Sequence, residues 1–321
     1  MASADAADAA RWIELASRGD FEAAWRVSDR VLARRRGRPV DHLPRHVQPV
    51  WDGTPLRGRR VLIRCYHGLG DTLQFIRYAP VVKSVASEVI VWAQRPLLPL
   101  LASMGSIDRL VALHDGAPEV AADVHVEVME LPFVFRTTLA TIPASVPYLS
   151  VTPACPPDDA TLPRIGLVWR SGAWNPRRSI PFGLFETIID RTLARWYLLQ
   201  QDIGPDERRP DLPAIAGATV LETARRMRAM DLVITIDSMP AHLAGALAVP
   251  VWTILPHAAD WRWMQGRSDS PWYPTMRLFR QQHPDDWESV LHGVREALAG
   301  WIGAHPHPSP LPQAGEGAGS R

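Results

Sequence analysis

Lysine is almost absent from this sequence: Lys83 is the only one, so every other residue in the total of 35 lysines and arginines is an arginine. Lys83 follows Val82 rather than a glycine, which excludes the phosphate-binding Walker A loop. Cysteine is equally scarce, with only Cys65 and Cys155. Two cysteines cannot build a disulfide framework or a structural zinc site, so we expect two reduced thiols in a cytosolic protein.

Long apolar runs are missing as well. No stretch of about 18 apolar residues occurs, and the first residues contain Asp5, Asp8 and Arg11 where a signal peptide would have its apolar core. The sequence therefore predicts a cytoplasmic protein with at most peripheral membrane contact. The formal net charge over 321 residues is only +1, which gives no overall attraction to nucleic acid. A hydrophobic fraction of 46% over this length indicates about two domains, each with its own core.

Several catalytic motifs are also missing. There is no Asp-x-Asp pair of the kind that holds the metal of metal-dependent sugar transferases. Neither a Gly-x-Ser-x-Gly nucleophile turn nor a His-Glu-x-x-His zinc helix occurs, and the histidines lack the spacing of metal ligands. These absences favour a metal-free reaction on a nucleotide-like anion, with no metal and no cofactor expected.

What is present begins with two amphipathic helices. Apolar residues recur at helical spacing between residues 4 and 36, and Arg18-Gly19-Asp20 interrupts the pattern once. The spacing around this break is similar to one tetratricopeptide unit, although stable arrays need about three units. We assign residues 1–45 to a helical hairpin with its linker. Whether the hairpin only packs on the main body or also recruits a partner stays open.

Strands alternate with helices through the rest of the chain, which is typical of parallel, doubly wound sheets. A second proline-rich linker divides this pattern into residues 46–157 and 158–303, so we expect an α/β fold with two Rossmann-like domains facing each other across a cleft. Residues 304–321 are rich in proline and glycine and are expected to form a disordered tail. The expected strands are 61–65, 89–92, 110–113, 124–126, 164–169, 196–200, 232–236 and 249–255, and the expected helices are 72–84, 96–102, 182–193, 222–230, 239–247 and 286–301.

A glycine turn follows the first of these strands. Gly68 and Gly70 would let a ligand approach the backbone at a helix N-terminus. Leu73 stands in place of the third glycine of a dinucleotide fingerprint, which argues against that type of site. Asp71, which closes the turn, is either a cap of the following helix or a general base in a cleft.

Two segments of the second domain are suited to an anion. Asp237, Ser238, Met239 and His242 follow a buried strand and lie at the start of a helix, where the backbone favours negative charge. The alternative for this segment is an ordinary helix cap beside a buried histidine.

The other segment is a loop after the strand that ends near Trp169. It carries the side chains of Arg170, Asn175, Arg177 and Arg178, and arginines in such a loop can bind phosphate in a bidentate manner. The alternative for these arginines is solvated surface charge.

Several motifs, in the same order along the chain, resemble those of tetratricopeptide-associated bacterial glycosyltransferases. That family is related to the ADP-heptose–lipopolysaccharide heptosyltransferases of glycosyltransferase family nine and, more distantly, to O-linked N-acetylglucosamine transferase. The resemblance covers roughly residues 51–301, and its motifs are HGLGDTLQFIRY (67–78), GLVW (166–169), RSIP (178–181), DS (237–238), HLAGAL (242–247), LP (255–256), DWRW (260–263) and SPWYP (270–274).

The resemblance implies a GT-B fold in which the C-terminal domain holds the nucleotide-sugar donor and the N-terminal domain holds the acceptor. It implies an inverting, metal-independent transfer with Asp71 as the base. It also implies that Arg178, with Arg177 as the second candidate, is the donor-phosphate cation, and that residues 237–242 form the pyrophosphate-binding turn. Gln201 departs from the family, because relatives often have a lysine there, so one donor-phosphate contact has no counterpart.

The predicted function is transfer of a sugar from a nucleotide-diphosphate donor to the hydroxyl of a glycan, a lipid-linked molecule or a protein. Lipopolysaccharide or surface-glycan assembly is one setting for such a reaction, and nucleic acid is not an expected partner. One alternative is a GT-B scaffold that binds a nucleotide sugar or a partner without transfer. The other is a nucleotide-sugar epimerase, which would alter the donor in the absence of an acceptor.

Overall fold

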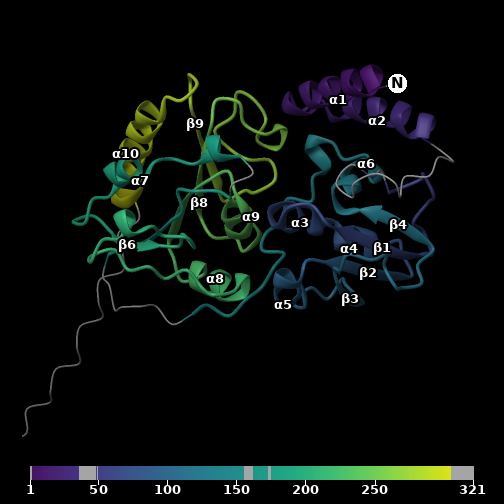
Figure 1. Ribbon diagram of the computed structural model, residues 1–321, viewed down its shortest axis with the longest axis horizontal. Coiled ribbons are helices and arrows are strands. Elements are labelled where there is room, and N and C mark those ends of the chain that lie inside the picture. The colour runs from purple at the N-terminus through teal and green to yellow at the C-terminus, as the bar shows by residue number, and fades with distance from the viewer. Residues whose placement is uncertain (1, 36–47, 49, 155–161, 173–174, 305–321) are drawn as a thin grey trace, which may run out of the picture.

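The computed structural model describes residues 2–35, 48, 50–154, 162–172 and 175–304. Two parallel sheets lie beside each other, and the N-terminal helix pair lies along one side of them (Figure 1). Cys155 and the predicted tail beyond residue 304 lie outside the described residues, as does most of the two expected linkers.

The N-terminal hairpin consists of α1 (Ala2–Ser17) and α2 (Phe21–Arg35), which confirms the helix pair expected from the apolar spacing. The chain reverses at Gly19, whose φ of +78° lies in the left-handed region that glycine adopts without strain. The Asp20 carboxylate then accepts a hydrogen bond from the Ala23 backbone N–H at 3.1 Å and caps α2. Between residue 2 and the first strand, the described residues hold this one pair of helices.

The first sheet has four parallel strands in the order β3-β2-β1-β4. Val61, Leu62 and Ile63 of the central strand have no solvent-accessible surface, as expected for a continuous apolar run in a parallel sheet that is covered on both faces. The strands are β1 (Arg60–Cys65), β2 (Glu88–Ala93), β3 (Arg109–Ala112) and β4 (Val124–Glu127).

The second sheet has five parallel strands in the order β6-β5-β7-β8-β9. They are β5 (Arg164–Leu167), β6 (Arg195–Leu198), β7 (Leu232–Ile236), β8 (Val251–Leu255) and β9 (Met276–Arg280). The last strand was not expected from the sequence, and it pairs with β8 at the edge of the sheet. Two parallel sheets with intervening helices confirm the predicted α/β fold with two Rossmann-like units.

Two expected helices are shorter than their apolar patterns predict. The segment 72–84 is divided into α3 (Leu69–Phe75), the 3-10 turn η2 (Ile76–Tyr78) and α4 (Ala79–Lys83). Pro80 has no backbone N–H, so it cannot make the helical hydrogen bond to the Ile76 carbonyl, and a regular helix does not continue through it. The segment 182–193 is likewise reduced to α7 (Phe182–Phe185) and η7 (Glu186–Ile188).

The other helices follow the expected alternation with strands. The α-helices are α5 (Leu98–Leu101), α6 (Leu131–Val134), α8 (Val220–Met227), α9 (Met239–Ala246) and α10 (Trp287–Ala304). The remaining 3-10 turns are η3 (Arg95–Leu97), η4 (Val128–Glu130), η5 (Leu139–Thr141), η6 (Pro176–Arg178), η8 (Pro205–Glu207) and η9 (Trp261–Trp263).

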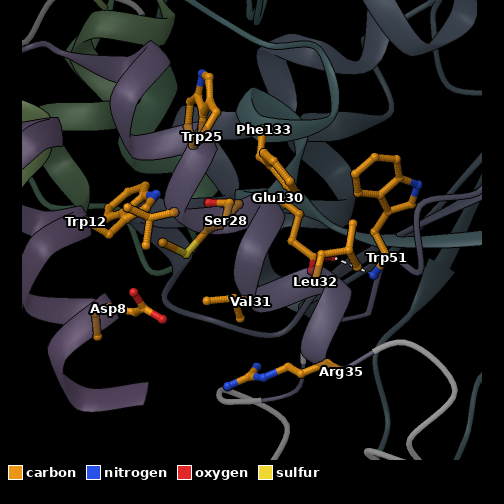
Figure 2. A pocket seen from close by; sticks show the side chains of 13 residues that line it. Asp8, Trp12, Trp25, Ser28, Val31, Leu32, Arg35, Trp51, Glu130 and Phe133 are labelled. Atoms are coloured by element: carbon orange, nitrogen blue, oxygen red, sulfur yellow. Dashed lines mark hydrogen bonds between the residues drawn. The ribbon is translucent and has the colours of Figure 1, made fainter. Parts of the chain in front are cut away.

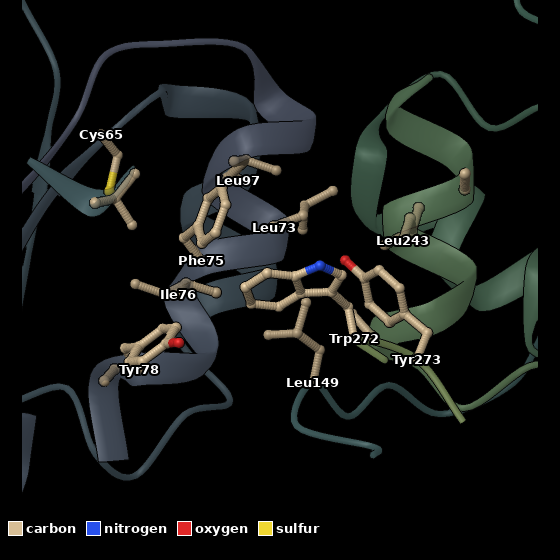
Figure 3. Close-up of a cluster of buried hydrophobic side chains, with 14 of the residues drawn as sticks. Cys65, Leu73, Phe75, Ile76, Tyr78, Leu97, Leu149, Leu243, Trp272 and Tyr273 are labelled. Atoms are coloured by element: carbon tan, nitrogen blue, oxygen red, sulfur yellow. The ribbon is translucent and has the colours of Figure 1, made fainter. Parts of the chain in front are cut away.

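The two Rossmann-like units meet where α3 packs against α9. Buried side chains from both units form one continuous cluster there, and Figure 3 shows Leu73 and Phe75 facing Trp272 and Tyr273. The rings of Phe75 and Trp272 meet edge to face, with their centroids 5.6 Å apart. The core therefore runs through the junction without a solvent-filled break at this point.

A buried arginine reinforces the junction. Arg77, 2% exposed, donates from Nη2 to the Tyr148 hydroxyl at 3.0 Å and from Nη1 to the Trp272 carbonyl. Its guanidinium carbon lies 4.7 Å from the ring centroid of Tyr148 and 4.4 Å from that of Tyr273. Arg77 thus connects the segment after α3 to the second unit.

The N-terminal hairpin contacts both units. Trp12 packs edge-on against Trp261 at 5.0 Å between ring centroids, and the Ser17 carbonyl accepts a hydrogen bond from the Gln265 N–H at 2.8 Å. On the other side, Trp25 donates from Nε1 to the Thr137 carbonyl at 2.6 Å. The hairpin is therefore attached to the first and the second unit at the same time.

Candidate functional site

The candidate site lies where the carboxyl ends of β1 and β7 lead into α3 and α9. In doubly wound folds, ligands bind at the carboxyl ends of parallel strands. The two helices approach closely because Gly70 has no side chain: a Cβ there would lie 2.9 Å from Cδ2 of His242. Gly68 precedes α3 with extended backbone angles. Gly70, which was expected in the turn before the helix, lies in the first turn of α3, where it allows close packing across the junction.

Asp71 makes two charge-assisted contacts at the start of α3. Its Oδ2 accepts a hydrogen bond from the Gly68 backbone N–H at 2.9 Å. Gly68 is the N-cap residue and Asp71 is the third residue of α3, so Asp71 caps the helix from within its first turn and not from the position before the helix that the sequence predicted. Its Oδ1 lies 2.9 Å from Nη1 of Arg262 on the other unit. The side chain is 20% exposed, so the carboxylate is still accessible from solvent.

Arg262 was not among the site residues expected from the sequence, although the DWRW motif contains it. It lies on η9, and the Asp260 carboxylate accepts from the Arg262 backbone N–H at 3.1 Å and forms a 3.1 Å ion pair with Nε. Burial alone would lower the pKa of Arg262, but the carboxylates of Asp260, Asp71 and Asp237 raise it. Arg262 is therefore a fully charged cation among three carboxylates.

Asp237 follows the last residue of β7 and is 3% exposed. Burial raises the pKa of this carboxyl, and the nearby Arg262 and Arg178 act in the opposite direction. Nη1 of Arg178 lies 3.8 Å from Oδ2 of Asp237. The predicted donor-phosphate cation and the predicted pyrophosphate turn therefore lie together.

The first residues of α9 are arranged differently from those of α3. Ser238 occupies the N-cap position, but its hydroxyl donates to the Ile236 carbonyl at 3.3 Å, and no side-chain hydrogen bond caps this helix. Met239, the first helical residue, is half-buried, and its Cα would lie 3.5 Å from a Cβ on Gly70. The N-terminus of α9 thus has no capping side chain of its own.

His242 lies deeper in the junction than a residue exposed to a ligand would. It is 2% exposed, its Nδ1 is 3.0 Å from the Tyr273 hydroxyl, and its ring stacks on Trp263 at 5.2 Å. Burial, together with the charges of Arg262, Arg77 and Arg178, lowers the pKa of His242 well below its usual value. The imidazole is therefore neutral at pH 7, and its contacts in this structure are packing contacts.

The remaining loop residues are distributed unevenly around the site. Nη1 of Arg170 forms an ion pair with Oε1 of Glu207. Asn175 is half-buried at the N-cap position of η6. Arg177 is exposed, whereas Arg178 reaches Asp237. Among the four loop residues proposed to bind the donor, the structure brings Arg178 to the junction.

Gln201, which stands where relatives often have a lysine, has a structural role here. Its Nε2 donates to the Gly217 carbonyl at 2.8 Å and to the Thr223 hydroxyl at 3.2 Å. These contacts hold the loop that precedes α8. The amide is thus engaged within the second unit.

A second residue that sequence analysis missed is Glu127 at the end of β4. It is 3% exposed, its Oε2 accepts from the Met129 N–H at 2.7 Å, and its Oε1 is buried without a hydrogen-bond partner, 3.7 Å from Nε2 of His67. Burial raises its pKa well above the usual value, and the nearby Glu130 and Asp71 add to the effect. An acidic residue within the apolar run VHVEV was the available signal.

A separate hollow lies beneath the N-terminal hairpin (Figure 2). It has a volume of about 290 Å³, and Trp12, Trp25, Trp51 and Phe133 line it. The carboxylate of Glu130 also borders it and accepts from the Val50 and Trp51 backbone N–H groups. None of the residues at the α3–α9 junction contributes to this hollow.

The described residues offer no evident metal site and no membrane span. In residues 2–304, apart from the gaps named above, no three His, Cys, Asp or Glu side chains are grouped so that they could hold a metal ion. Within the same residues, no helix is both long enough and apolar enough to cross a bilayer.

Comparison with known proteins adds a fold assignment. No protein-family model matches the chain. The protein FlbA of Caulobacter vibrioides is 25% identical over 301 residues, which cover 77% of this chain and 48% of FlbA. The chain thus spans about half the length of this curated relative.

Several solved structures match the chain over a larger share of their own length than FlbA does. A family 9 glycosyl transferase from Veillonella parvula matches with a TM-score of 0.58 at 13% identity, over 78% of this chain and 99% of that one. The dodecameric glycosyltransferase TibC from enterotoxigenic E. coli matches with a TM-score of 0.54 at 14% identity, over 79% and 77%. E. coli heptosyltransferase WaaC, solved with ADP-2-deoxy-2-fluoro heptose, matches with a TM-score of 0.52 at 12% identity, over 75% and 99%. The chain therefore has the GT-B fold of these glycosyltransferases, with two Rossmann-like units, and its N-terminus forms a helix pair.

Proposed function

We propose that the protein is an inverting, metal-independent glycosyltransferase that moves a sugar from a nucleoside-diphosphate donor to a hydroxyl acceptor. The observation that carries the proposal is the position of Asp71. Its carboxylate lies on the first unit of a GT-B fold and meets, across the junction, the arginine of η9. The α9 N-terminus, beside Arg178 and Asp237, supplies the other half of the site.

The reaction would proceed in one displacement. Asp71 accepts the proton of the acceptor hydroxyl while that oxygen attacks the anomeric carbon. The bond between this carbon and the diphosphate oxygen breaks, and the leaving diphosphate keeps the electron pair. The positive end of the α9 dipole and the Arg178 guanidinium stabilise the negative charge that develops there.

The donor class follows from the same elements. A helix N-terminus and a nearby arginine suit a diphosphate, and TibC and WaaC have been solved with ADP-heptose and an analogue of it. We therefore propose a nucleoside-diphosphate sugar as the donor and ADP-heptose as the first to test. A glycan, lipid-linked or protein hydroxyl is the acceptor class, and lipopolysaccharide or surface-glycan assembly on the cytoplasmic side is the proposed setting.

Thermal unfolding in the presence of ADP, UDP, GDP and CDP tests the donor site directly. A nucleotide present at about 100 times its dissociation constant should stabilise the native state by roughly 2.7 kcal/mol. The nucleotide that does so then defines the donor series for a transfer assay, in which NMR of the product reports whether the anomeric centre is inverted. If none of the four changes the melting temperature, the proposed donor site is wrong.

The contacts of Asp71 and Gln201 favour a second candidate, a scaffold that binds a nucleotide sugar without transferring it. Both carboxylate oxygens of Asp71 already have protein partners, and Gln201 is engaged by Gly217 and Thr223. Such a scaffold would bind the nucleoside diphosphate but would release no nucleotide from the sugar donor when acceptors are supplied. The transfer assay separates the two functions.

A further inference from the structure

Arg262 occupies a position between the two halves of the proposed site. Its Nη1 contacts Asp71 of the first unit at 2.9 Å, and its Nε pairs with Asp260 of the second at 3.1 Å. It also lies near enough to Asp237 for the two charges to affect each other's pKa. The Arg262 guanidinium therefore contacts the proposed base, Asp71, and interacts electrostatically with Asp237 at the start of the proposed donor turn.

The contact to Asp71 engages the oxygen that would otherwise accept a proton. Oδ2 is held by the Gly68 N–H, and Oδ1 is held by Arg262. An ionised carboxylate has further lone pairs, but the paired Arg262 occupies one direction of approach to Oδ1. Without donor, Asp71 is thus held in a form poorly suited to act as a base.

A diphosphate would compete with Asp71 for this arginine. Phosphate oxygens carry more charge than one carboxylate and match the planar guanidinium in bidentate geometry. Arg262 is also the buried cation beside Asp237, at the turn where the diphosphate is proposed to bind. Gln201 does not supply a second cation, which increases the share of this role left to Arg262 and Arg178.

The backbone around Arg262 is held by the packing of the residues on either side of it. Its neighbours on η9 are both fixed: Trp261 stacks on Phe75 at 6.2 Å, and Trp263 stacks on His242 at 5.2 Å. A shift of the guanidinium from one oxygen partner to another therefore requires rotation about its side-chain bonds and leaves η9 in place.

We propose that Arg262 couples donor binding to the base: the bound diphosphate takes the guanidinium from Asp71 and frees Oδ1 to accept the acceptor proton. This inference rests on the proposed function. It makes Arg262 a positioning residue for Asp71 and a contact residue for the donor. It also sets an order, in which the donor binds before the acceptor is activated.

Competition between Asp71 and the diphosphate can be measured without turnover. Isothermal calorimetry with the nucleoside diphosphate that stabilises the wild type would be carried out on four full-length proteins: wild type, Asp71→Asn, Arg262→Gln and the double variant. Coupling predicts that Asp71→Asn tightens nucleotide binding by roughly fivefold or more, because the competitor for Arg262 has been weakened. Arg262→Gln should weaken binding at least tenfold, and in that background Asp71→Asn should have no further effect.

Arg267→Gln, in the exposed pair with Asp269 on the same loop, is the matched control and should bind as the wild type does. Unchanged or weaker nucleotide binding in Asp71→Asn would overturn the coupling. This comparison of Asp71→Asn with the wild type can be made even if the Arg262→Gln protein does not fold. Additive effects in the double variant would also overturn it and leave Arg262 as a structural tie between the units. If the wild type binds none of the nucleotides, the proposed function itself fails, and that result is distinct from a wild type that binds without coupling.

Discussion

The helices α3 and α9 begin in the same setting, at the carboxyl ends of parallel strands, but their N-termini are completed in opposite ways. At α3, the chain supplies its own anion, because Asp71 folds back onto the Gly68 N–H. At α9, the Ser238 hydroxyl turns away to the Ile236 carbonyl, and no side chain caps the helix. A helix N-terminus that already holds a carboxylate has less to offer a second anion, whereas one without a capping side chain is suited to an anion from outside. This contrast supports the proposal that the acceptor side is at α3 and the donor side at α9.

The largest effect is expected from Asp71→Asn, which tests the α3 side of this contrast. Asn keeps the capping geometry but cannot accept a proton at neutral pH, so the transfer rate should fall by about 10²–10⁴-fold. Because Arg262 loses a charged partner in a buried position, the free energy of unfolding should also fall, by about 1–3 kcal/mol. Initial rates and denaturant unfolding on one preparation measure both effects.

Asp123→Asn is the matched control for that variant. Asp123 forms an ion pair with Arg60, with a distance of 2.8 Å between Oδ1 and Nη2, and this pair lies away from the site. It should leave the transfer rate unchanged. A near-normal rate in Asp71→Asn would exclude the base assignment and leave the carboxylate as a cap.

The close approach of the two N-termini can be broken by Gly70→Ala. The added methyl would lie 2.9 Å from Cδ2 of His242, so α3 and α9 must move apart. Overpacking of this kind costs about 1–3 kcal/mol in the free energy of unfolding, measured by urea titration. Gly105→Ala, where nothing lies within 4 Å of the new methyl, should cost much less. Equal losses in the two variants would contradict close packing at Gly70.

The donor side is tested by Arg178→Ala. Because a charged contact to the diphosphate would be lost, its dissociation constant should rise about tenfold, as measured by calorimetry. Arg177→Ala removes the exposed neighbour and should change the dissociation constant by less than about twofold, as is usual for surface charges. The reverse ranking would move the donor-phosphate role to Arg177.

The smallest effect concerns pH and the packing of α9. His242 is held neutral because burial and nearby arginines depress its pKa, whereas in the unfolded chain it is protonated below its ordinary value of about 6.5. Its contribution to stability is therefore complete above that value and is lost as the pH falls toward its folded pKa, by up to about 1.4 kcal/mol per pH unit.

In unfolding measurements between pH 7 and pH 5, His242→Gln should lose less stability than the wild type, although it is less stable at pH 7. The control is His292→Gln, which replaces an exposed histidine on the surface of α10. Parallel curves for wild type and His242→Gln would show that His242 does not titrate as its surroundings require.

The sequence was most informative where local pattern and tertiary structure agree. The apolar runs of β1 and β7 predicted both strands, because a buried parallel strand needs only a continuous apolar segment. The start of α9 was predicted at Met239, whereas α3 begins at Leu69, three residues before its predicted start. β9 was missed because its edge position leaves Arg277 exposed and interrupts the apolar pattern.

Site residues that act through distant partners were harder to predict. Arg262 is separated from Asp71 by 191 positions, and the need for a cation at that carboxylate arises only when the two units meet. Glu127 is an isolated acid whose burial depends on the packing around β4. His242 shows the converse case: its place in the helix was predicted, but its contact with Tyr273 placed it in the core.

The attachment of the N-terminal hairpin to both units has a mechanical consequence. Rotation of one unit away from the other must separate Trp12 from Trp261 or Trp25 from the Thr137 carbonyl, in addition to parting α3 from α9. Two units connected only by a linker are restrained by that linker alone, whereas here the hairpin forms a second connection between them. Any opening of the junction is therefore limited by the packing of α1 and α2 against both units.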